Sequence, residues 1–239
     1  WNPNYWVELP KRIRAGLIFL EKVRVIPEID LTEAYVNQMK NEVRFLIAYY
    51  YSLMIELYGP IPFTPGVIYP VDASESELMT PQVPYDQIVD WIDKELLDVS
   101  KNLPAVYPSN ADWGKATSIM ALAIRAKTLL YAASPLYNGN LDFFNVVDNK
   151  GNQLISQTYD ESKWAKAAAA AKDVIELAKT SGLYELYTIA PKIGTLDMYR
   201  PPVHPEYSTK DYPDGWANID PLLSYKSNFD GSVQGSKNP

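Results

Sequence analysis

Two residue types that carry much of enzyme chemistry are scarce in this sequence of 239 residues, which has no cysteine and one histidine, His204. Without cysteine the chain forms no internal disulfide and offers no thiolate for a metal site or for cysteine catalysis. His204 lies between Val203 and Pro205, and no nucleophile motif accompanies it. A single histidine without further ligands does not build a zinc site. We therefore expect no catalytic residues, no metal site and no cofactor.

Basic residues are also in short supply, because 22 Lys and Arg stand against 29 Asp and Glu and give a formal charge of −7. Recognition of a nucleic-acid backbone requires clustered Lys and Arg, and no such cluster occurs. Long apolar runs are missing as well, since no stretch reaches the roughly 18 residues that a membrane-spanning helix needs. Neither a nucleic-acid partner nor a membrane-spanning segment is expected from these residues.

What the sequence does contain is helical periodicity, with apolar residues at the spacing of amphipathic helices in five segments. The predicted helices cover residues 7–25, 32–58, 84–103, 115–134 and 160–181. Ile13, Leu17 and Leu20 share one face of the first helix, and Gly59-Pro60 ends the second. Pro135 stops the fourth helix, because proline lacks the N–H that a helix interior requires. The chain is predicted to be mainly α-helical.

Apolar stripes predict which faces of these helices point inward. The stripe of the second helix is Val43, Leu46, Ile47, Tyr50, Leu53, Met54 and Leu57. That of the third is Tyr85, Ile88, Ile92, Leu96, Val99 and Leu103. That of the fifth is Trp164, Ala168, Ala171, Ile175 and Ala178. The fourth helix has few charges and many alanines, which predicts that it is covered on most sides.

The order of the elements suggests stacked antiparallel helix pairs. The third and fourth helices start about thirty residues apart, close to the period of roughly 34 that tetratricopeptide repeats show. An ordinary helical bundle is the alternative, because the loops at 59–83 and 135–159 break a strict period. We predict a helical scaffold over residues 1–189 and an irregular segment, rich in proline and aromatic residues, over residues 190–239.

Carboxylates are plentiful, so a pair of the kind that hydrolyses glycosides has to be considered. Asp90, Asp93 and Glu95 lie on the predicted third helix, where a solvated face explains them. The segment "DNKGN" at 148–152 resembles a calcium-binding loop in composition. It lacks the alternating acidic positions and the final Glu of an EF-hand, which favours a simple turn.

Aromatic side chains are the most suggestive feature for binding. Trp and Tyr offer flat faces that stack on the C–H faces of sugar rings. Tyr50 and Tyr131 lie on helices and are predicted to belong to the core. Tyr199, Tyr212 and Trp216 lie among Gly, Pro and Asp in the irregular segment, where a role in ligand binding is favoured.

Several stretches resemble, in the right order, the SusD-like (RagB/SusD) family. These are "VRFLIAYYYSLMIELYGPIPF", "YDQIVDWIDKELLDVSKNLP", "WGKATSIMALAIRAKTLLYAASPLYNG", "WAKAAAAAKDVIELAKTSGLYELY" and "DPLLSYKSNFDGSVQGSKNP". The last looks like the approach to a family Asn-Pro-Glu motif. One departure is Gly16, where the family usually has Asn. The family is about twice as long, so we interpret the chain as part of a longer protein.

The resemblance implies a non-catalytic lipoprotein on the extracellular face of the Bacteroidetes outer membrane. Such proteins capture an oligosaccharide, or a peptide in some relatives, and deliver it to a SusC-like TonB-dependent transporter. The lipid anchor would lie outside this chain. The implied fold has tetratricopeptide-like pairs beside an irregular region that carries much of the ligand site. An α-helical glycoside hydrolase and a purely structural helical-repeat adaptor are the rival hypotheses.

Residue type and location give a set of candidate ligand contacts. They are Trp216, Tyr212, Tyr199, Arg200 and Asp214, with Trp1 and Asn4 as outlying members near the first helix. Tyr137 and Asn138, in "ASPLYNG", either fix the turn after the fourth helix or approach ligand. We favour the first role, because that motif belongs to the scaffold of relatives with different ligands.

Overall fold

The computed structural model describes residues 4–184 of the chain. Five long helices fill most of that range: α1 Tyr5–Lys22, α2 Glu33–Tyr58, α4 Tyr85–Asn102, α5 Ser118–Ala133 and α6 Ser162–Ser181. Four short elements lie in the connections: η1 Pro27–Ile29, α3 Glu75–Leu78, η2 Asn110–Asp112 and η3 Leu141–Phe143. Within the same range β pairing is limited to isolated bridges. The mainly helical fold predicted from the sequence is confirmed.

Contacts divide the chain into two compact units, Trp1–Leu177 and Ala178–Pro239. The described part of the first unit holds α1 to α5 and most of α6. The domain boundary predicted at residue 189 lies outside the described residues. Among residues 4–184, no helix is both long and apolar enough to cross a membrane.

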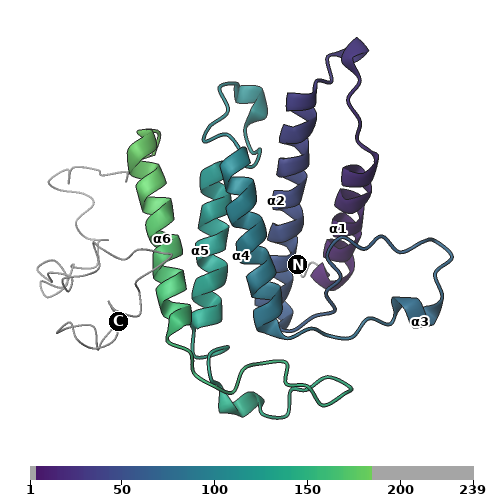
Figure 1. Cartoon of the computed structure of the whole chain (residues 1–239), viewed down its shortest axis with the longest axis vertical. Coiled ribbons are helices and arrows are strands. Elements are labelled where there is room, and N and C mark those ends of the chain that lie inside the picture. The colour runs from purple at the N-terminus through teal and green to yellow at the C-terminus, as the bar shows by residue number, and fades with distance from the viewer. Residues whose placement is uncertain (1–3, 185–239) are drawn as a thin grey trace, which may run out of the picture. The chain divides into compact units, whose positions relative to one another are not determined.

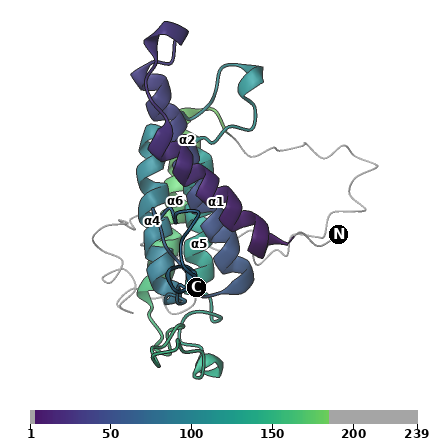
Figure 2. The ribbon, with the colours of Figure 1, turned by 90° about the vertical axis from the view of Figure 1, so that its right-hand side faces the viewer.

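Consecutive long helices of the first unit run in opposite directions (Figure 1). α4 packs against α5 and α2, and α1 packs against α2, which it crosses obliquely (Figure 2). Gly16 of α1 lies at this crossing, because a Cβ added there would be 3.0 Å from Cγ1 of Ile47. The residue that departs from the family pattern therefore lets the two helices approach closely. The tetratricopeptide-like pairing stays a prediction.

The centre of the core is built by α4. Its predicted apolar stripe is buried at every position: Tyr85, Ile88, Ile92, Leu96, Val99 and Leu103. Residues at this spacing line one side of a helix, and here that side meets both α2 and α5. Burial of each large apolar side chain stabilises the fold by roughly 2 kcal/mol. This stripe was predicted correctly because the opposite side of α4 is strongly polar.

The inward face of α2 differs in part from the prediction. Leu46 and Leu57 are exposed, while Phe45, Ala48, Tyr51 and Ile55 are buried. The reason is that α2 is contacted by α1 and by α4, so its buried surface is wide and is centred one position away from the predicted stripe. Tyr50 is half-buried and packs against the core, in line with its predicted role.

The buried face of α6 was predicted correctly at Trp164, which packs against the core, but not further along the helix. Ala171 and Ile175 are exposed, whereas the buried positions are Ala165, Ala167, Ala169 and Ala170. The sequence has five consecutive alanines here, and such a run has no periodicity from which a face could be read.

One side of α5 is also open, against the prediction that this helix is covered on most sides. Met120, Leu130 and Tyr131 are exposed, so the core position predicted for Tyr131 is wrong. The low charge of α5 instead reflects the tight contact of its other side with α4, where Ala121 and Ala133 are fully buried.

Ion pairs join the helices, and they correct the interpretation of two α4 carboxylates as a solvated face. Asp93 accepts a hydrogen bond of 2.5 Å from Nε of Arg125 on α5, whose Nη1 also donates to Asp173 of α6 at 2.7 Å. Glu95 accepts two hydrogen bonds from Arg44 of α2. Asp90, by contrast, is exposed as predicted.

The turn after α5 is fixed by two buried side chains. Tyr137 stacks face to face on Tyr85, with ring centroids 3.8 Å apart and planes 7° from parallel. The Asn138 amide donates to the carbonyls of Ala133 and Asp160, and its oxygen accepts the Asp160 N–H at 2.7 Å. The favoured prediction, that these residues fix the turn, is confirmed.

Candidate ligand-binding cavity

Most of the ligand contacts predicted from the sequence lie outside the described residues: Trp216, Tyr212, Tyr199, Arg200, Asp214 and Trp1. Asn4 is described and is exposed. Its carbonyl accepts hydrogen bonds from the N–H groups of Val7 and Glu8 at the start of α1, while its side chain makes no capping bond. A ligand contact through the Asn4 side chain stays a prediction.

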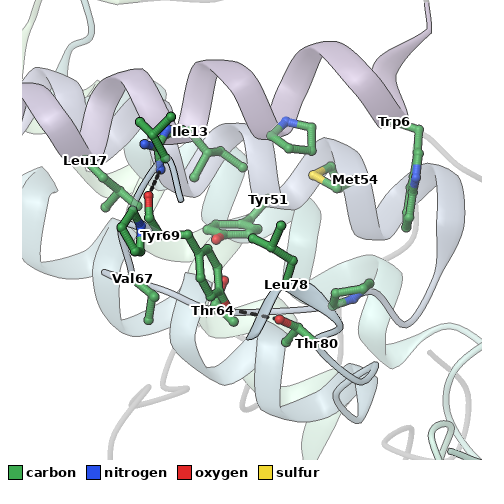
Figure 3. A pocket seen from close by; sticks show the side chains of 15 residues that line it. Trp6, Ile13, Leu17, Tyr51, Met54, Thr64, Val67, Tyr69, Leu78 and Thr80 are labelled. Atoms are coloured by element: carbon green, nitrogen blue, oxygen red, sulfur yellow. Dashed lines mark hydrogen bonds between the residues drawn. The ribbon is translucent and has the colours of Figure 1, made fainter. Parts of the chain in front are cut away.

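A cavity of about 700 Å³ lies between α1, α2 and the loop that connects α2 to α4 (Figure 3). α1 contributes Trp6, Pro10, Ile13, Arg14 and Leu17, and α2 contributes Tyr51 and Met54. The loop contributes Pro62, Thr64, Val67, Tyr69, Pro70, Val71, Leu78 and Thr80. Binding sites for small ligands commonly have this volume and a mostly apolar wall with a few polar groups.

The outer wall is a proline-rich loop that hydrogen bonds hold in place. Nη1 of Arg14 donates to the carbonyl of Tyr69 at 2.6 Å, and the Tyr69 hydroxyl pairs with Oγ1 of Thr80 at 2.9 Å. Figure 3 marks both bonds with dashed lines. At the base of the loop, the Gln82 amide donates to the carbonyl of Pro60 at 2.8 Å. Backbone bonds alone would not fix this segment, because prolines remove several of its donors.

Tyr51 forms the floor of the cavity, and two further rings pack against it from behind. Tyr51 meets Phe63 edge to face at 4.8 Å and Trp91 at 5.5 Å, and the last two meet each other at 5.4 Å. Such arrangements are favourable beyond the burial of area. Burial, with a smaller contribution from Tyr69, raises the pKa of Tyr51 to about 12. The Tyr51 phenol is therefore neutral at physiological pH and takes no part as a charged group.

At the end of the cavity, Trp6 offers an accessible ring. It is 46% exposed and meets Tyr58 edge to face, with centroids 5.1 Å apart. An indole that is held by a neighbouring ring and still open to solvent can stack on an apolar ligand face. Figure 3 shows Trp6 and Tyr69 on different sides of the opening.

The cavity lining is poor in charged side chains. Among the described residues that line it, Arg14 is the only charged one, so the lining has no carboxylate pair to serve as acid and nucleophile. Described Asp and Glu side chains elsewhere, such as Asp93 and Glu95, are engaged in ion pairs between helices. Arginine is always protonated and does not serve as a general base.

The segment at 148–152 is a turn, as favoured from the sequence. The Asp148 carboxylate accepts hydrogen bonds of 2.8 Å from the N–H groups of Lys150 and Asn152 and from the Asn152 amide. These bonds, that of the Asn152 side chain first, lower the pKa of Asp148. In residues 4–184, no three metal-ligating side chains are grouped to hold an ion.

A cavity lined by apolar and aromatic side chains on a stable helical frame is typical of ligand-binding modules. The chain belongs to the SusD-like family: the family model described as "Starch-binding associating with outer membrane" matches residues 1–130. The resemblance drawn from the sequence is thus confirmed. No curated protein matches the chain.

Solved structures agree with this assignment. The chain is similar to a protein named BT4246, with a TM-score of 0.70 and 38% identity over 76% of this chain and 31% of that chain. A selenomethionine structure of BT4246 matches with a TM-score of 0.64 and 33% identity over 87% of this chain and 32% of that chain. A SusD-like protein from Bacteroides fragilis, BF3747, matches with a TM-score of 0.51 and 19% identity over 77% of this chain and 28% of that chain. At this identity the likeness is one of fold alone. The chain therefore spans about a third of the length of these relatives.

Sequence reasoning missed the cavity, although one signal was present. The loop after Gly59-Pro60 has apolar and aromatic residues such as Val67, Tyr69 and Val71, where a solvated connection would be polar. Val71 is 99% exposed and Met79 71%. Exposed apolar residues gathered in one loop indicate a surface that contacts something else.

Proposed function

We propose that the protein captures a carbohydrate at the outer membrane without reacting with it. The observation that carries this proposal is the cavity between α1, α2 and the 59–84 loop, in a chain that belongs to the SusD-like family. Its volume of about 700 Å³ is large enough for a few sugar units. Trp6 and Tyr69 offer ring faces, and Thr64 and Thr80 offer hydroxyls.

Carbohydrates suit such a cavity because a sugar ring has apolar C–H faces and a polar rim. The apolar faces match indole and phenol rings, and the hydroxyls match the threonine side chains and the backbone of the loop. The predicted contacts Trp216, Tyr212, Tyr199, Arg200, Asp214, Trp1 and Asn4 belong to the same proposal as additional ring and polar contacts. A peptide ligand is the alternative within the family.

Delivery to a SusC-like TonB-dependent transporter, and a lipid anchor on the extracellular face, complete the proposal. The family description, association with the outer membrane, supports this location. We expect the full-length protein, isolated from native outer membranes, to bring a TonB-dependent transporter with it. Isolation without any transporter, under conditions that keep other outer-membrane complexes intact, would contradict this part.

Calorimetry of the full-length protein against a panel of oligosaccharides tests the binding function. We expect Trp6→Ala to weaken binding of the best glycan about fivefold, because stacking on one ring contributes on the order of 1 kcal/mol. Trp113→Ala is the matched control, since Trp113 is another exposed indole that does not line the cavity. An equal loss of glycan affinity in the two variants would mean that the cavity is not the binding site.

The rival functions give different results in the same experiments. A glycoside hydrolase would release product from a glycan of the panel, whereas we expect none. A peptide-binding relative would bind peptides and ignore sugars. A structural adaptor would keep its protein partner after Trp216→Ala and Tyr212→Ala. Failure of the folded protein to bind any glycan would overturn the proposed function.

A further inference from the structure

Arg14 is placed differently from Arg44 and Arg125, two arginines that join the long helices. It lies on α1, is half-buried and lines the cavity. Its single hydrogen bond among the described residues goes from Nη1 to the backbone carbonyl of Tyr69. By contrast, Arg44 and Arg125 each pair with two carboxylates. Arg14 thus has no acidic partner in the described part of the chain.

The surplus of carboxylates in this chain makes that placement notable. With 29 Asp and Glu against 22 Lys and Arg, negative partners are abundant, yet the described lining of the cavity contains none. A guanidinium has five N–H donors in a fixed planar fork, and one carbonyl uses one of them. The remaining donors suit an oxyanion, which a guanidinium binds through two parallel hydrogen bonds.

We propose that the cavity takes an acidic oligosaccharide, in which Arg14 pairs with an oxyanion carried by the sugar. This inference rests on the proposed function and narrows its substrate class. The oxyanion is either the carboxylate of a uronic acid or a sulfate ester, which share a negative charge and at least two terminal oxygens that a guanidinium can bind side by side. Trp6 and Tyr69 would hold the ring faces while Arg14 selects the charged unit.

A purely structural role for Arg14 makes a different prediction. If the side chain only fastens the loop to α1, every ligand of the cavity should be affected to the same degree by its replacement. Arg14→Gln separates the two roles, because glutamine keeps a polar side chain with N–H donors but has no charge. Arg12→Gln is the matched control, since Arg12 is exposed on the same helix and does not line the cavity.

The experiment compares a uronic-acid oligosaccharide with its methyl ester, and a sulfated oligosaccharide with its unsulfated parent. Calorimetry uses the full-length protein and the two Arg→Gln variants. We expect the protein to bind one charged member at least tenfold more tightly than its neutral partner. Arg14→Gln should abolish that preference, and Arg12→Gln should retain it. The pair that shows the preference identifies the oxyanion.

Four results would overturn the inference. Equal binding of the charged and neutral partners, or binding of neutral glycans only, would refute it and leave glycan capture intact. If Arg14→Gln weakened the binding of the charged and the neutral oligosaccharide equally, Arg14 would have only the structural role of holding the loop against α1. Binding of peptides with no glycan bound would overturn the proposed function together with this refinement.

Discussion

Two connections of this fold begin with a proline just after the end of a long helix, yet one is buried and the other is exposed. The segment 134–140, after α5, turns inward, and the Tyr137 and Asn138 side chains are 6% and 4% exposed. The loop 59–84, after α2, spreads outward, and its Val71 is 99% exposed. The same local signal, a helix stopped by proline, therefore says nothing about where the chain goes next.

The difference lies in how each segment satisfies its polar groups. In 134–140, one buried amide, that of Asn138, serves three backbone groups at once, so the turn has a single arrangement. In 59–84, separate side-chain bonds such as Arg14 to Tyr69 and Tyr69 to Thr80 fasten the loop at half-buried points. The first arrangement belongs to a scaffold, and the second leaves apolar surface available for a ligand.

Removal of the amide in the buried turn should have the largest effect on stability. Asn138→Ala leaves the Asp160 N–H without its acceptor and opens a small cavity, which should destabilise the protein by about 3 kcal/mol. Urea denaturation of the full-length protein measures this loss. Asn140→Ala is the control, because its bonds are exposed, and it should cost less than about 1 kcal/mol. Equal losses would remove the distinction between buried and exposed amides in this turn.

Two glycines sharpen the comparison, since both have positive φ but different surroundings. Gly139 has φ of 78°, and a Cβ there would lie 2.7 Å from the Tyr159 nitrogen. Gly66 has φ of 81° and open space around it. Gly139→Ala should therefore cost about 2 kcal/mol and Gly66→Ala about 1 kcal/mol, the second from backbone strain alone. A cost for Gly66→Ala equal to that for Gly139→Ala would mean that the close approach of Tyr159 has no consequence.

The sequence predicted the frame better than the cavity, and particular residues explain why. The α4 stripe and the turn at Tyr137 and Asn138 could be foreseen because local periodicity and a motif define them. The face of α6 could not, since a run of alanines has no direction. The path of the 59–84 loop depends on contacts such as Arg14 with Tyr69, which are 55 residues apart in the sequence. No local pattern encodes such a pair.

The floor of the cavity should respond to alkaline pH. The pKa of Tyr51 is raised from 10.0 to about 12, chiefly by burial, so the folded state holds this proton where the unfolded chain loses it. Its contribution to stability is fully present below pH 10 and is lost as the pH rises from 10 to 12. At pH 11 the loss should be about 1 kcal/mol. Tyr51→Phe should reduce the fall in stability between pH 9 and pH 11, measured by urea denaturation.

Other buried tyrosines also contribute to the fall in stability at alkaline pH. Burial also raises the pKa of Tyr85, which lies in the frame beside Tyr137. Tyr51→Phe should therefore leave a residual fall that belongs to the frame. If the fall between pH 9 and pH 11 is the same in the variant and in the unmodified protein, the Tyr51 phenol is not protected by the loop.

The smallest effect is expected at the outer wall of the cavity. The Tyr69 hydroxyl and Oγ1 of Thr80 are 2.9 Å apart, and both residues are half-buried, so water can replace either partner. A double-mutant cycle with Tyr69→Phe and Thr80→Val should give a coupling energy of about 0.5 kcal/mol in the free protein. The coupling should increase when glycan is bound, because the ligand excludes water from the wall. A coupling as large as the effect of Asn138→Ala would place this loop with the scaffold, and the contrast between the two proline-led connections would disappear.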